Sequence, residues 1–294
     1  MSLISKAERK FICDGVAQGI RNDGRRNNQF RKIEIETNIV MQSHGSARVR
    51  FVEGGTDVIT SVRVETLNSK EVPTPQEQID VSLSFMASSS PTFISREKSV
   101  EGDLLAESIS KVLTAPGVID LGELTIVKGL FYWKIGIDIQ VFGDNGNVYD
   151  LAMLSVVAAL HSTRIPCTIP VKNYEQEEKD FEIDDDATHF RRINCMAVPI
   201  SISMSKIGNS IIVDATKEEE NCMDSWLLVC VNRRKEIVGV QNQKGKVDSD
   251  VLLGSLQVAS TVSSDLFKLL DEVIEKDDQK WSSCILPTKR GLFV

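Results

Sequence analysis

The stretch from Trp133 to Pro166 most constrains what this chain can fold into. From Trp133 to Val141 every odd-numbered residue is apolar, and the even-numbered ones are Lys, Gly, Asp and Gln, which is the period-two pattern of a strand with one buried face. The residues GDNGN at 143–147 tolerate positive φ and predict a turn. Residues 151–160 are nearly all apolar or small, which predicts a helix that is buried on all sides. This helix should end before Pro166, because the residue before a proline disfavours the helical conformation. We therefore expect a strand, a turn and a buried helix at the centre of the fold.

Helix and strand patterns continue on both sides of this centre. Ser5 and Glu8 form an S-x-x-E capping box ahead of a short amphipathic helix that ends near Gly19. Before the centre, apolar runs predict strands at 33–35, 47–51, 58–64, 79–85 and 121–127. Polar stretches predict loops at 68–78 and 88–103, and apolar residues at helical spacing predict a helix at 104–113. After it, we expect strands at 167–171, 196–205, 210–214, 225–231 and 236–241, a long helix over 249–276 and a terminal tail.

The composition is that of an ordinary soluble globular protein. The chain has 294 residues, of which 41% are hydrophobic and 26% charged, so it can bury a sizeable core. No apolar run approaches the length of a membrane span and the N-terminus has no signal-peptide pattern, so we expect an intracellular protein without a membrane partner. The six cysteines form no CxxC pair and His44, His161 and His189 lie far apart, so we expect reduced cysteines, no metal and no cofactor.

The net charge of −8 comes almost entirely from one segment. Residues 175–186, EQEEKDFEIDDD, hold eight acids and one lysine, a charge of −7, which leaves −8 − (−7) = −1 for the rest of the chain. We expect an acidic loop here that divides two lobes and faces outward or meets a basic partner. This net charge argues against general nucleic-acid binding by the whole chain, but local basic patches remain possible.

Several motifs together resemble the RNase PH family. The segments are RNDGR at 21–25, FRKIEIETN from Phe30, GSARVRF at 45–51, GGTDVITSVRVE at 54–65 and KIGNSIIVDATKEEENCMD at 206–224, together with the strand, turn and helix at 133–166. Each is weak alone, but their order and spacing match over about residues 8–275. The resemblance implies an α+β RNase PH fold, with an N-terminal lobe similar to domain 2 of ribosomal protein S5 and a smaller α/β C-terminal lobe. We expect the lobes at residues 1–172 and 191–294, joined by an acidic connecting loop at 173–190.

Within the family, the chain resembles a non-catalytic ring subunit of the eukaryotic RNA exosome. This implies a structural subunit of a ring whose channel threads RNA for 3′–5′ processing and degradation, in ribosomal RNA maturation and messenger RNA turnover. The implied partners are other RNase PH-like ring subunits, cap subunits with S1 and KH domains, a hydrolytic nuclease and single-stranded RNA. The implied location is the nucleus, nucleolus and cytoplasm. By the same resemblance, the arginines of RNDGR are architectural.

Active members of the family shorten RNA from its 3′ end by phosphorolysis. This reaction needs cations that hold inorganic phosphate and an acid that protonates the leaving oxygen or positions a metal. The resemblance implies an arginine-rich turn at the start of the helix near Asp103. This chain has SVEGDLLAES there, with Glu101 and Asp103 where positive charge is needed. Carboxylates repel phosphate, and we interpret these two as helix caps.

The resemblance also implies a pair of acids ten and twelve residues after Asp214. The first position is Asp224 and the second, where active relatives carry the catalytic acid, is Trp226. An indole can neither donate a proton usefully nor bind a metal, and we interpret the remaining Asp224 as a structural partner. We therefore expect no catalytic residue and a catalytically inactive chain.

Candidate RNA contacts are Arg96 and Lys98, in the polar stretch at 88–100, because exposed cations suit sequence-independent phosphate contact. The alternative is a charged loop that is simply solvated. Two other functions stay open. One is an active phosphate-dependent 3′–5′ exoribonuclease, alone or with a composite site shared with a partner. The other is a kinase-like or isomerase-like enzyme of the wider superfamily, against which stands the absence of a glycine-rich nucleotide loop.

Overall fold

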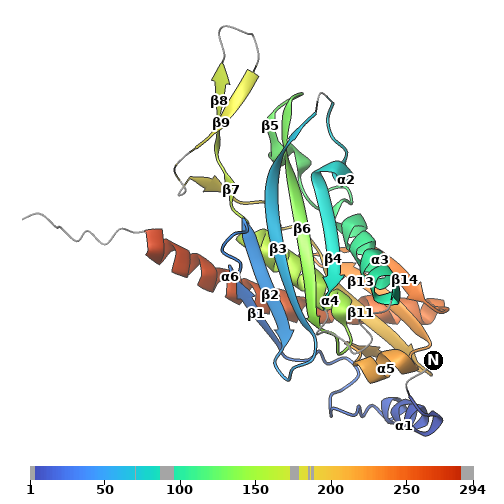
Figure 1. The fold of residues 1–294 in the computed structure, drawn as a ribbon. Helices are drawn as coiled ribbons and strands as arrows, with labels where there is room; N and C mark the ends of the chain where they lie inside the picture. Colours follow the sequence, from blue (N-terminus) through green and yellow to red (C-terminus); the bar gives the residue numbers. More distant parts are fainter. Residues whose placement is uncertain are drawn as a thin grey trace, which may run out of the picture.

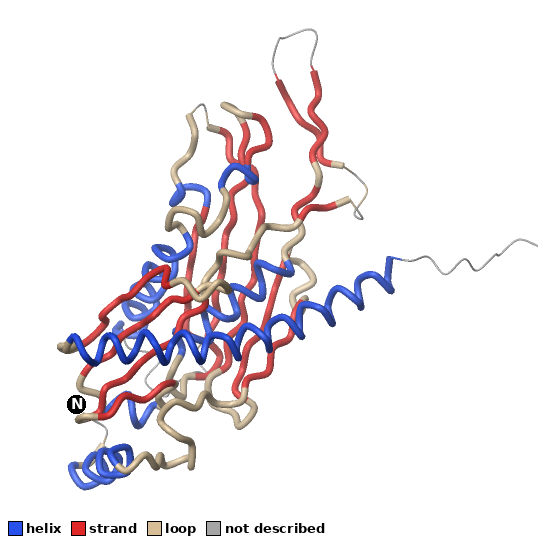
Figure 2. Tube along the Cα trace, turned by 180° about the vertical axis from the view of Figure 1, so that it is seen from behind, coloured by secondary structure: helices blue, strands red, loops and turns tan. Residues whose placement is uncertain are grey.

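The computed structural model describes residues 4–69, 71–86, 96–172, 179–184, 186 and 189–285, without side chains at 96–99, 170–172, 179 and 280–285. Two sheets enclose one buried helix (Figure 1). A long helix crosses the opposite side of the molecule, which Figure 2 shows. Helices and strands are mixed along the chain, so the predicted α+β class is confirmed.

The larger sheet contains the predicted central strand. Its strands lie in the order β1-β2-β3-β6-β4, with β5 paired to β6, and β4 runs parallel to β6. The odd-numbered residues of β6 from Trp133 to Val141 are buried, as their alternation predicts. The strands are β1 (Ile33–Thr37), β2 (Gly45–Phe51), β3 (Asp57–Asn68), β4 (Ile79–Phe85), β5 (Thr125–Val127) and β6 (Phe131–Gly143).

The buried helix is α4 (Val148–Ser162), and it confirms the prediction of a helix packed on all sides. All of its residues except His161 are buried. It packs on β2 and β3 of the larger sheet and on β11 of the second sheet. The turn before it needs a glycine at position 146, where φ is +84° and a Cβ would come within 2.7 Å of the backbone of Ala215 and Lys217. The GDNGN turn therefore brings the two sheets together.

The second sheet and its helices come from the C-terminal part of the chain. Its strands lie in the order β12-β11-β13-β14. They are β11 (Ile200–Ile207), β12 (Ser210–Val213), β13 (Ser225–Val231) and β14 (Ile237–Lys244), with α5 (Lys217–Cys222) between β12 and β13. The N-terminal helix α1 (Lys6–Ala17), with the predicted capping box of Ser5 and Glu8, contacts α5 and β12.

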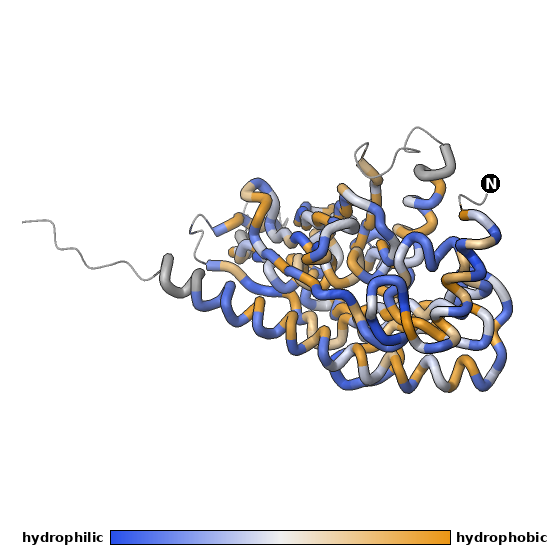
Figure 3. The backbone as a smooth tube through the Cα atoms, turned by 90° about the horizontal axis from the view of Figure 1, so that it is seen from below, coloured by the Kyte–Doolittle hydropathy of each residue, from blue (hydrophilic) through white to orange (hydrophobic). Residues whose placement is uncertain are grey.

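The long helix α6 (Ser249–Ile285) is amphipathic over its described side chains. Apolar and polar residues alternate along it (Figure 3), and Ala259, Leu266, Phe267 and Leu270 are buried in the core. The helix extends nine residues beyond the predicted end at 276. Among the described residues, no helix is both long and apolar enough to span a membrane.

Three predicted elements of the N-terminal half are wrong in detail. The helix α3 begins at Arg96 (Arg96–Leu113), so residues 96–103 are not loop. The segment predicted as one strand at 121–127 begins with a 3₁₀ turn at 121–124, because Asp120 accepts a hydrogen bond from the backbone N–H of Gly122 at 2.9 Å. The loop predicted at 68–78 contains the short helix α2 (Pro75–Gln78), which proline at the first helical position favours.

In the C-terminal half, one helix was missed and one strand starts late. The helix α5 has a capping box of Thr216 and Glu219, a signal that is present in the sequence. The strand predicted from residue 196 begins only at Ile200, after a turn in which the backbone N–H of Val198 donates to the carbonyl of Cys195 at 3.2 Å.

The segment predicted as an acidic connecting loop contains two strands instead. β9 (Lys179–Ile183) pairs with β8 (Thr168–Lys172) as a two-stranded sheet, and β10 (Phe190–Arg191) pairs with β7 (Ile165–Pro166). The predicted strand at 167–171 is thus part of a hairpin, because its apolar residues pair with the alternating acidic and apolar residues of β9. This hairpin projects away from the two large sheets (Figure 1).

Five of the six cysteines have side chains that the structure describes. Cys13, Cys167, Cys195, Cys222 and Cys230 are all free thiols. In the described part of the chain, no group of three or more His, Cys, Asp or Glu residues is arranged to hold a metal ion.

Candidate functional site

The residues expected at an anion-binding turn, Glu101 and Asp103, lie inside α3. The helix begins at Arg96, so neither carboxylate can cap its first turn, and the capping interpretation is wrong. The polar stretch before residue 104 carries no apolar stripe, so the helix was expected to begin at 104 and these carboxylates to lie at its N-terminus. Both residues are exposed. The prediction of loop residues Arg96 and Lys98 is wrong for the backbone, and their side chains lie outside the described residues.

Asp224 holds two parts of the C-terminal region together. Its carboxylate accepts a hydrogen bond from the backbone N–H of Gly208 at 2.9 Å and one from Arg9 Nη2 at 3.4 Å. The first bond closes the turn between β11 and β12, and the second ties α1 to the sheet. In these two contacts the carboxylate links α1, the β11–β12 turn and the start of β13.

Replacing Asp224 with alanine is expected to lower the free energy of unfolding by no more than about 1 kcal/mol, because both members of its ion pair with Arg9 are about half exposed. Urea denaturation of the full chain measures this. The conservative variant Asp224→Asn should lie between wild type and alanine. A loss of several kcal/mol would contradict the exposed setting of this carboxylate.

Trp226 lies on β13, between Ser205 of β11 and Lys244 of β14. Its ring is partly buried against the hydrophobic core. Residues two apart on a strand share a face, so Trp226 lies on the same face as Leu228, whose neighbour on β11 is Ser203. Ser203 in turn bonds to Asp150 of α4. The position expected for a catalytic acid therefore holds an indole on the face that meets the buried helix.

A cluster of one amine and three carboxyl groups lies where α3, α5 and the β6–α4 turn meet; we call it the Lys217 cluster (Glu101, Asp144, Lys217, Glu220). Lys217 Nζ lies 3.1 and 3.0 Å from the two carboxylate oxygens of Asp144 and 3.3 Å from Glu220 Oε2. Glu220 also accepts the backbone N–H of Asn147 at 2.7 Å. The side chain of Asp144 is almost fully buried.

The charges of the Lys217 cluster shift two pKa values. Burial alone would lower the pKa of the Lys217 amine, but the surrounding carboxylates of Glu220, Asp144 and Glu101 outweigh burial and raise it. Burial raises the pKa of Glu220 despite the opposing effect of Lys217. The raised pKa keeps the amine protonated, and the carboxylates around it offset its charge, so it offers no excess positive charge to a phosphate.

Sequence reasoning missed this cluster. The signal was available in GDNG at 143–146 and KEEEN at 217–221, which both contain charges beside turn or cap residues. Only the fold shows that these two segments and α3 meet. Asp224 belongs to the contacts with Gly208 and Arg9 and Trp226 lies on β13, so the structure does not gather the predicted site residues into one site.

The arginines of RNDGR are buried structural groups. Asp214 accepts hydrogen bonds from Arg25 Nη1 at 2.7 Å, from Arg31 Nη2 at 2.7 Å and from Asn147 Nδ2 at 2.6 Å. Arg21 pairs with Glu219 and donates to the carbonyl oxygens of Val213 and Asp214. These guanidinium groups are used inside the protein, which confirms the architectural interpretation of the motif.

Asp150 is a buried carboxyl group in the first turn of α4. It accepts hydrogen bonds from Ser201 Oγ, from Ser203 Oγ and from the backbone N–H of Ser203, each at 2.8 Å. Burial raises the pKa of Asp150 to about 7, against the lowering effect of these three donors. The group joins α4 to β11.

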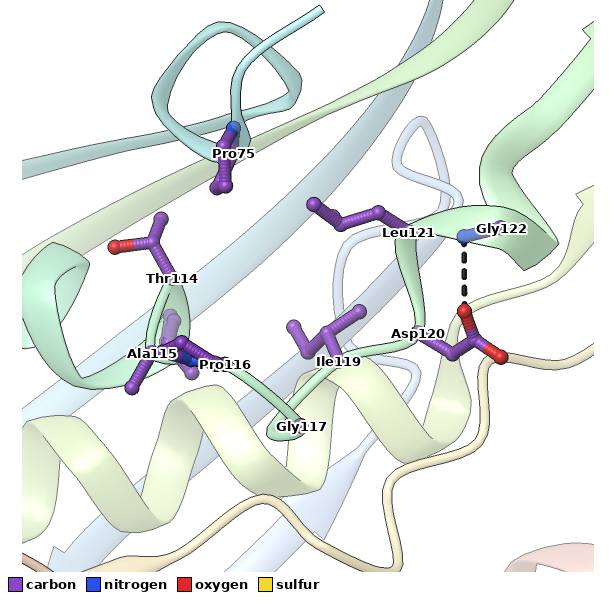
Figure 4. A pocket seen from close by; sticks show the side chains of 10 residues that line it. Pro75, Thr114, Ala115, Pro116, Gly117, Ile119, Asp120, Leu121 and Gly122 are labelled. Atoms are coloured by element: carbon purple, nitrogen blue, oxygen red, sulfur yellow. Dashed lines mark hydrogen bonds between the residues drawn. The ribbon is translucent and has the colours of Figure 1, made fainter. Parts of the chain in front are cut away.

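A pocket of about 590 Å³ lies apart from all of these residues. It is formed by α2, the C-terminal end of α3 and the segment that follows, and it is lined mainly by apolar side chains such as Pro75, Pro116, Ile119 and Leu121 (Figure 4). Of the expected site residues whose side chains are described, none lines it. It therefore offers no arrangement for phosphorolysis.

Comparison with known proteins decides the family. A model of the 3′ exoribonuclease family, domain 1, matches residues 29–166, and a model of its domain 2 matches residues 197–262. Exosome complex component Rrp42 of Methanocella arvoryzae is 31% identical over 244 residues, 81% of this chain and 85% of that protein. The chain belongs to the RNase PH family of 3′ exoribonucleases.

Other relatives of this RNase PH chain span nearly its whole length. The putative exosome complex exonuclease RRP42 of Dictyostelium discoideum is 27% identical and covers 94% of this chain and 99% of that protein. A chain of the Archaeoglobus fulgidus exosome with RNA bound to the active site is 24% identical, has a TM-score of 0.71 and covers 89% of this chain and 97% of that one. The RNase PH fold expected from the motifs is confirmed.

Proposed function

We propose that this chain is a catalytically inactive structural subunit of an RNA exosome core ring and helps to form the channel that threads RNA for 3′–5′ processing and degradation. Support for the ring role comes from relatives named exosome complex component Rrp42, which match it over most of its length. The proposed partners are other RNase PH-like ring subunits, S1 and KH cap subunits, a hydrolytic nuclease and single-stranded RNA.

The observation that carries the proposed inactivity is Trp226. Phosphorolysis needs a group that protonates the leaving oxygen or positions a metal beside it. The side chain at this position of β13 is an indole packed on the core, which has neither capacity. The neighbouring Asp224 is committed to Gly208 and Arg9, so it does not replace the missing acid.

The Lys217 cluster supports the same proposal. Inorganic phosphate must be held next to an RNA phosphodiester, which requires an excess of positive charge. The cluster instead has three carboxyl groups around one ammonium. It lies beside α3, the helix at whose start active relatives were expected to bind phosphate.

The competing function is an active phosphate-dependent 3′–5′ exoribonuclease, alone or with a composite site shared with a partner. The family as a whole favours it, and the Dictyostelium relative is named a putative exonuclease. Arg96 and Lys98, at the start of α3, stay predicted RNA contacts under either function. The lobe boundaries at 173–190 and the location in nucleus, nucleolus and cytoplasm also stay predictions.

A phosphorolysis assay separates the two functions. The purified full chain is incubated with uniformly labelled single-stranded RNA, magnesium and inorganic phosphate, and the released nucleoside diphosphates are measured. We expect no product above the enzyme-free blank. Trp226→Asp, which restores an acid, should also give none, because the Lys217 cluster has no positive charge available for phosphate.

The assay needs two controls. A phosphorolytic member of the family in the same buffer shows that the conditions support the reaction, and Trp226→Phe shows the effect of losing the indole alone. Product from the wild-type chain that depends on phosphate would overturn the proposed inactivity. Product from Trp226→Asp alone would overturn the argument from the Lys217 cluster.

A further inference from the structure

The hairpin of β8 and β9 (residues 168–172 and 179–183), here called the arm, stands apart from the rest of the fold. Figures 1 and 2 show it projecting beyond the larger sheet, and its two strands pair only with each other. At its base, the ring of Phe181 meets Phe131 of β6 edge-on, with centroids 5.0 Å apart. A two-stranded ribbon is only marginally stable by itself in water, so a projecting one gains from a surface that covers it.

The two faces of the arm differ. Thr168 pairs with Ile183 and Ile169 pairs with Glu182. Because successive side chains alternate, Phe181 and Ile183 share the face that meets β6 at its base, while Ile169, Asp180 and Glu182 share the other. Ile169 is 53% exposed, and Asp180 and Glu182 are exposed. The outer face thus has an exposed apolar side chain, Ile169, directly opposite Glu182, with Asp180 two residues from Glu182 on the same face of β9.

The carboxylates of this outer face have no ionic partner among the described side chains. Among the described residues, neither Asp180 nor Glu182 forms an ion pair. Asp184, next to the arm, does pair with His189, Oδ2 to Nδ1 at 2.9 Å. The sequence adds further acids, since residues 175–186 carry a charge of −7. Such a concentration of negative charge repels RNA and attracts a basic protein surface.

We propose that the arm is an assembly contact, in which the face of Ile169, Asp180 and Glu182 docks into a basic groove of a neighbouring protein subunit. Ile169 fills an apolar slot of that groove, and lysine or arginine side chains on its rim pair with the two carboxylates. This inference rests on the proposed function, because the neighbour is another subunit of the ring or its cap. It assigns to the acidic segment the role of meeting a basic partner.

The test uses the full chain co-expressed with the other core subunits. In the arm variant, Asp180→Asn and Glu182→Gln remove two charges and keep the shape of the hairpin; a second variant is Ile169→Ser. The matched control, Glu53→Gln with Glu272→Gln, removes two exposed acids elsewhere. Assembly is measured by mass photometry between low and high salt, and the melting temperature of each free chain shows that it is folded.

We expect the arm variant to raise the Kd for assembly about tenfold or more at low salt and to flatten its salt dependence, while the control behaves as wild type. Ile169→Ser should raise the Kd without changing the salt dependence. A photo-crosslinker at position 169 should react with a ring or cap subunit.

Three results would overturn the inference. One is an arm variant that assembles like the control at every salt concentration. Another is a crosslink from position 169 to RNA or to no other chain in the assembled complex. The third is a wild-type chain that does not assemble with the core subunits, which would overturn the ring role as well. The first two results leave the proposed ring role intact, so a failure of the arm inference can be distinguished from a failure of the ring role.

Discussion

Replacing Asp214 with alanine is expected to lower the free energy of unfolding by about 3–5 kcal/mol. The Asp214 side chain is fully buried, and those of its partners Arg25 and Arg31 are 10% and 7% exposed. Removing the carboxylate takes an acceptor from two buried guanidinium groups and from the amide of Asn147, and it removes the acidic partner of Arg31. Arg25 and Arg31 come from the N-terminal segment and Asn147 from the turn before α4, so the loss should weaken the attachment of the N-terminal segment to the two sheets. Urea denaturation followed by tryptophan fluorescence measures it.

Two further variants show that burial is the cause. Asp214→Asn keeps the size of the side chain and one acceptor oxygen, so it should be less harmful than alanine. Asp265→Ala removes an exposed carboxylate whose ion pair with Lys268 is about three-quarters exposed, so it should change stability by less than about 1 kcal/mol. If Asp214→Ala and Asp265→Ala had equal effects, Asp214 would not be the centre of a buried network.

The stability of the wild-type chain is expected to fall relative to Asp150→Asn as the pH rises from about 4 to about 7. Burial raises the pKa of Asp150 from 3.8 in a model compound to about 7. Between these values the folded chain binds a proton that the unfolded chain has released, so stability is lost as pH rises through the folded pKa. A shift of about three units corresponds to at most about 4 kcal/mol.

The measurement is the difference between the two unfolding free energies at several pH values, because other groups titrate in the same range. His161 acts in the opposite direction: burial lowers its pKa to about 4, so its contribution to stability grows as pH rises from about 4 to 6.5. That contribution is common to both proteins and cancels. A difference that stays constant from pH 4 to 7 would show that Asp150 ionises normally in the fold.

Local patterns predicted much of the fold. The alternation in β6, the all-apolar helix α4 and the capping box of Ser5 and Glu8 all appear where the sequence placed them. Each depends on interactions between residues close in sequence or on a burial pattern with a fixed period. The motifs that resemble the RNase PH family had the right order, and the family is confirmed.

Predictions that depended on polar segments were weaker. The start of α3 was placed eight residues late, because residues 96–103 carry no apolar stripe, and the acidic segment was predicted as loop although it pairs as β9. Residues 96–103 have no local periodicity of their own, and the alternation of acidic and apolar residues in β9 is too short to stand out within the acidic segment. The structure of each segment comes from a neighbour: β4 beside α3, and β8 beside β9.

The sequence by itself determined the central strand and helix, the family, and the presence of Trp226 where an acid was expected, because these follow from residue identity, periodicity and spacing. Only the tertiary structure decided which charges meet. It joined Lys217 to Asp144, Asp214 to Arg25 and Arg31, and left Asp180 and Glu182 on a projecting arm where neither forms an ion pair with a described residue. The physical reason is that an ion pair depends on distance and burial, and residues far apart in sequence acquire both only when the sheets and helices pack together.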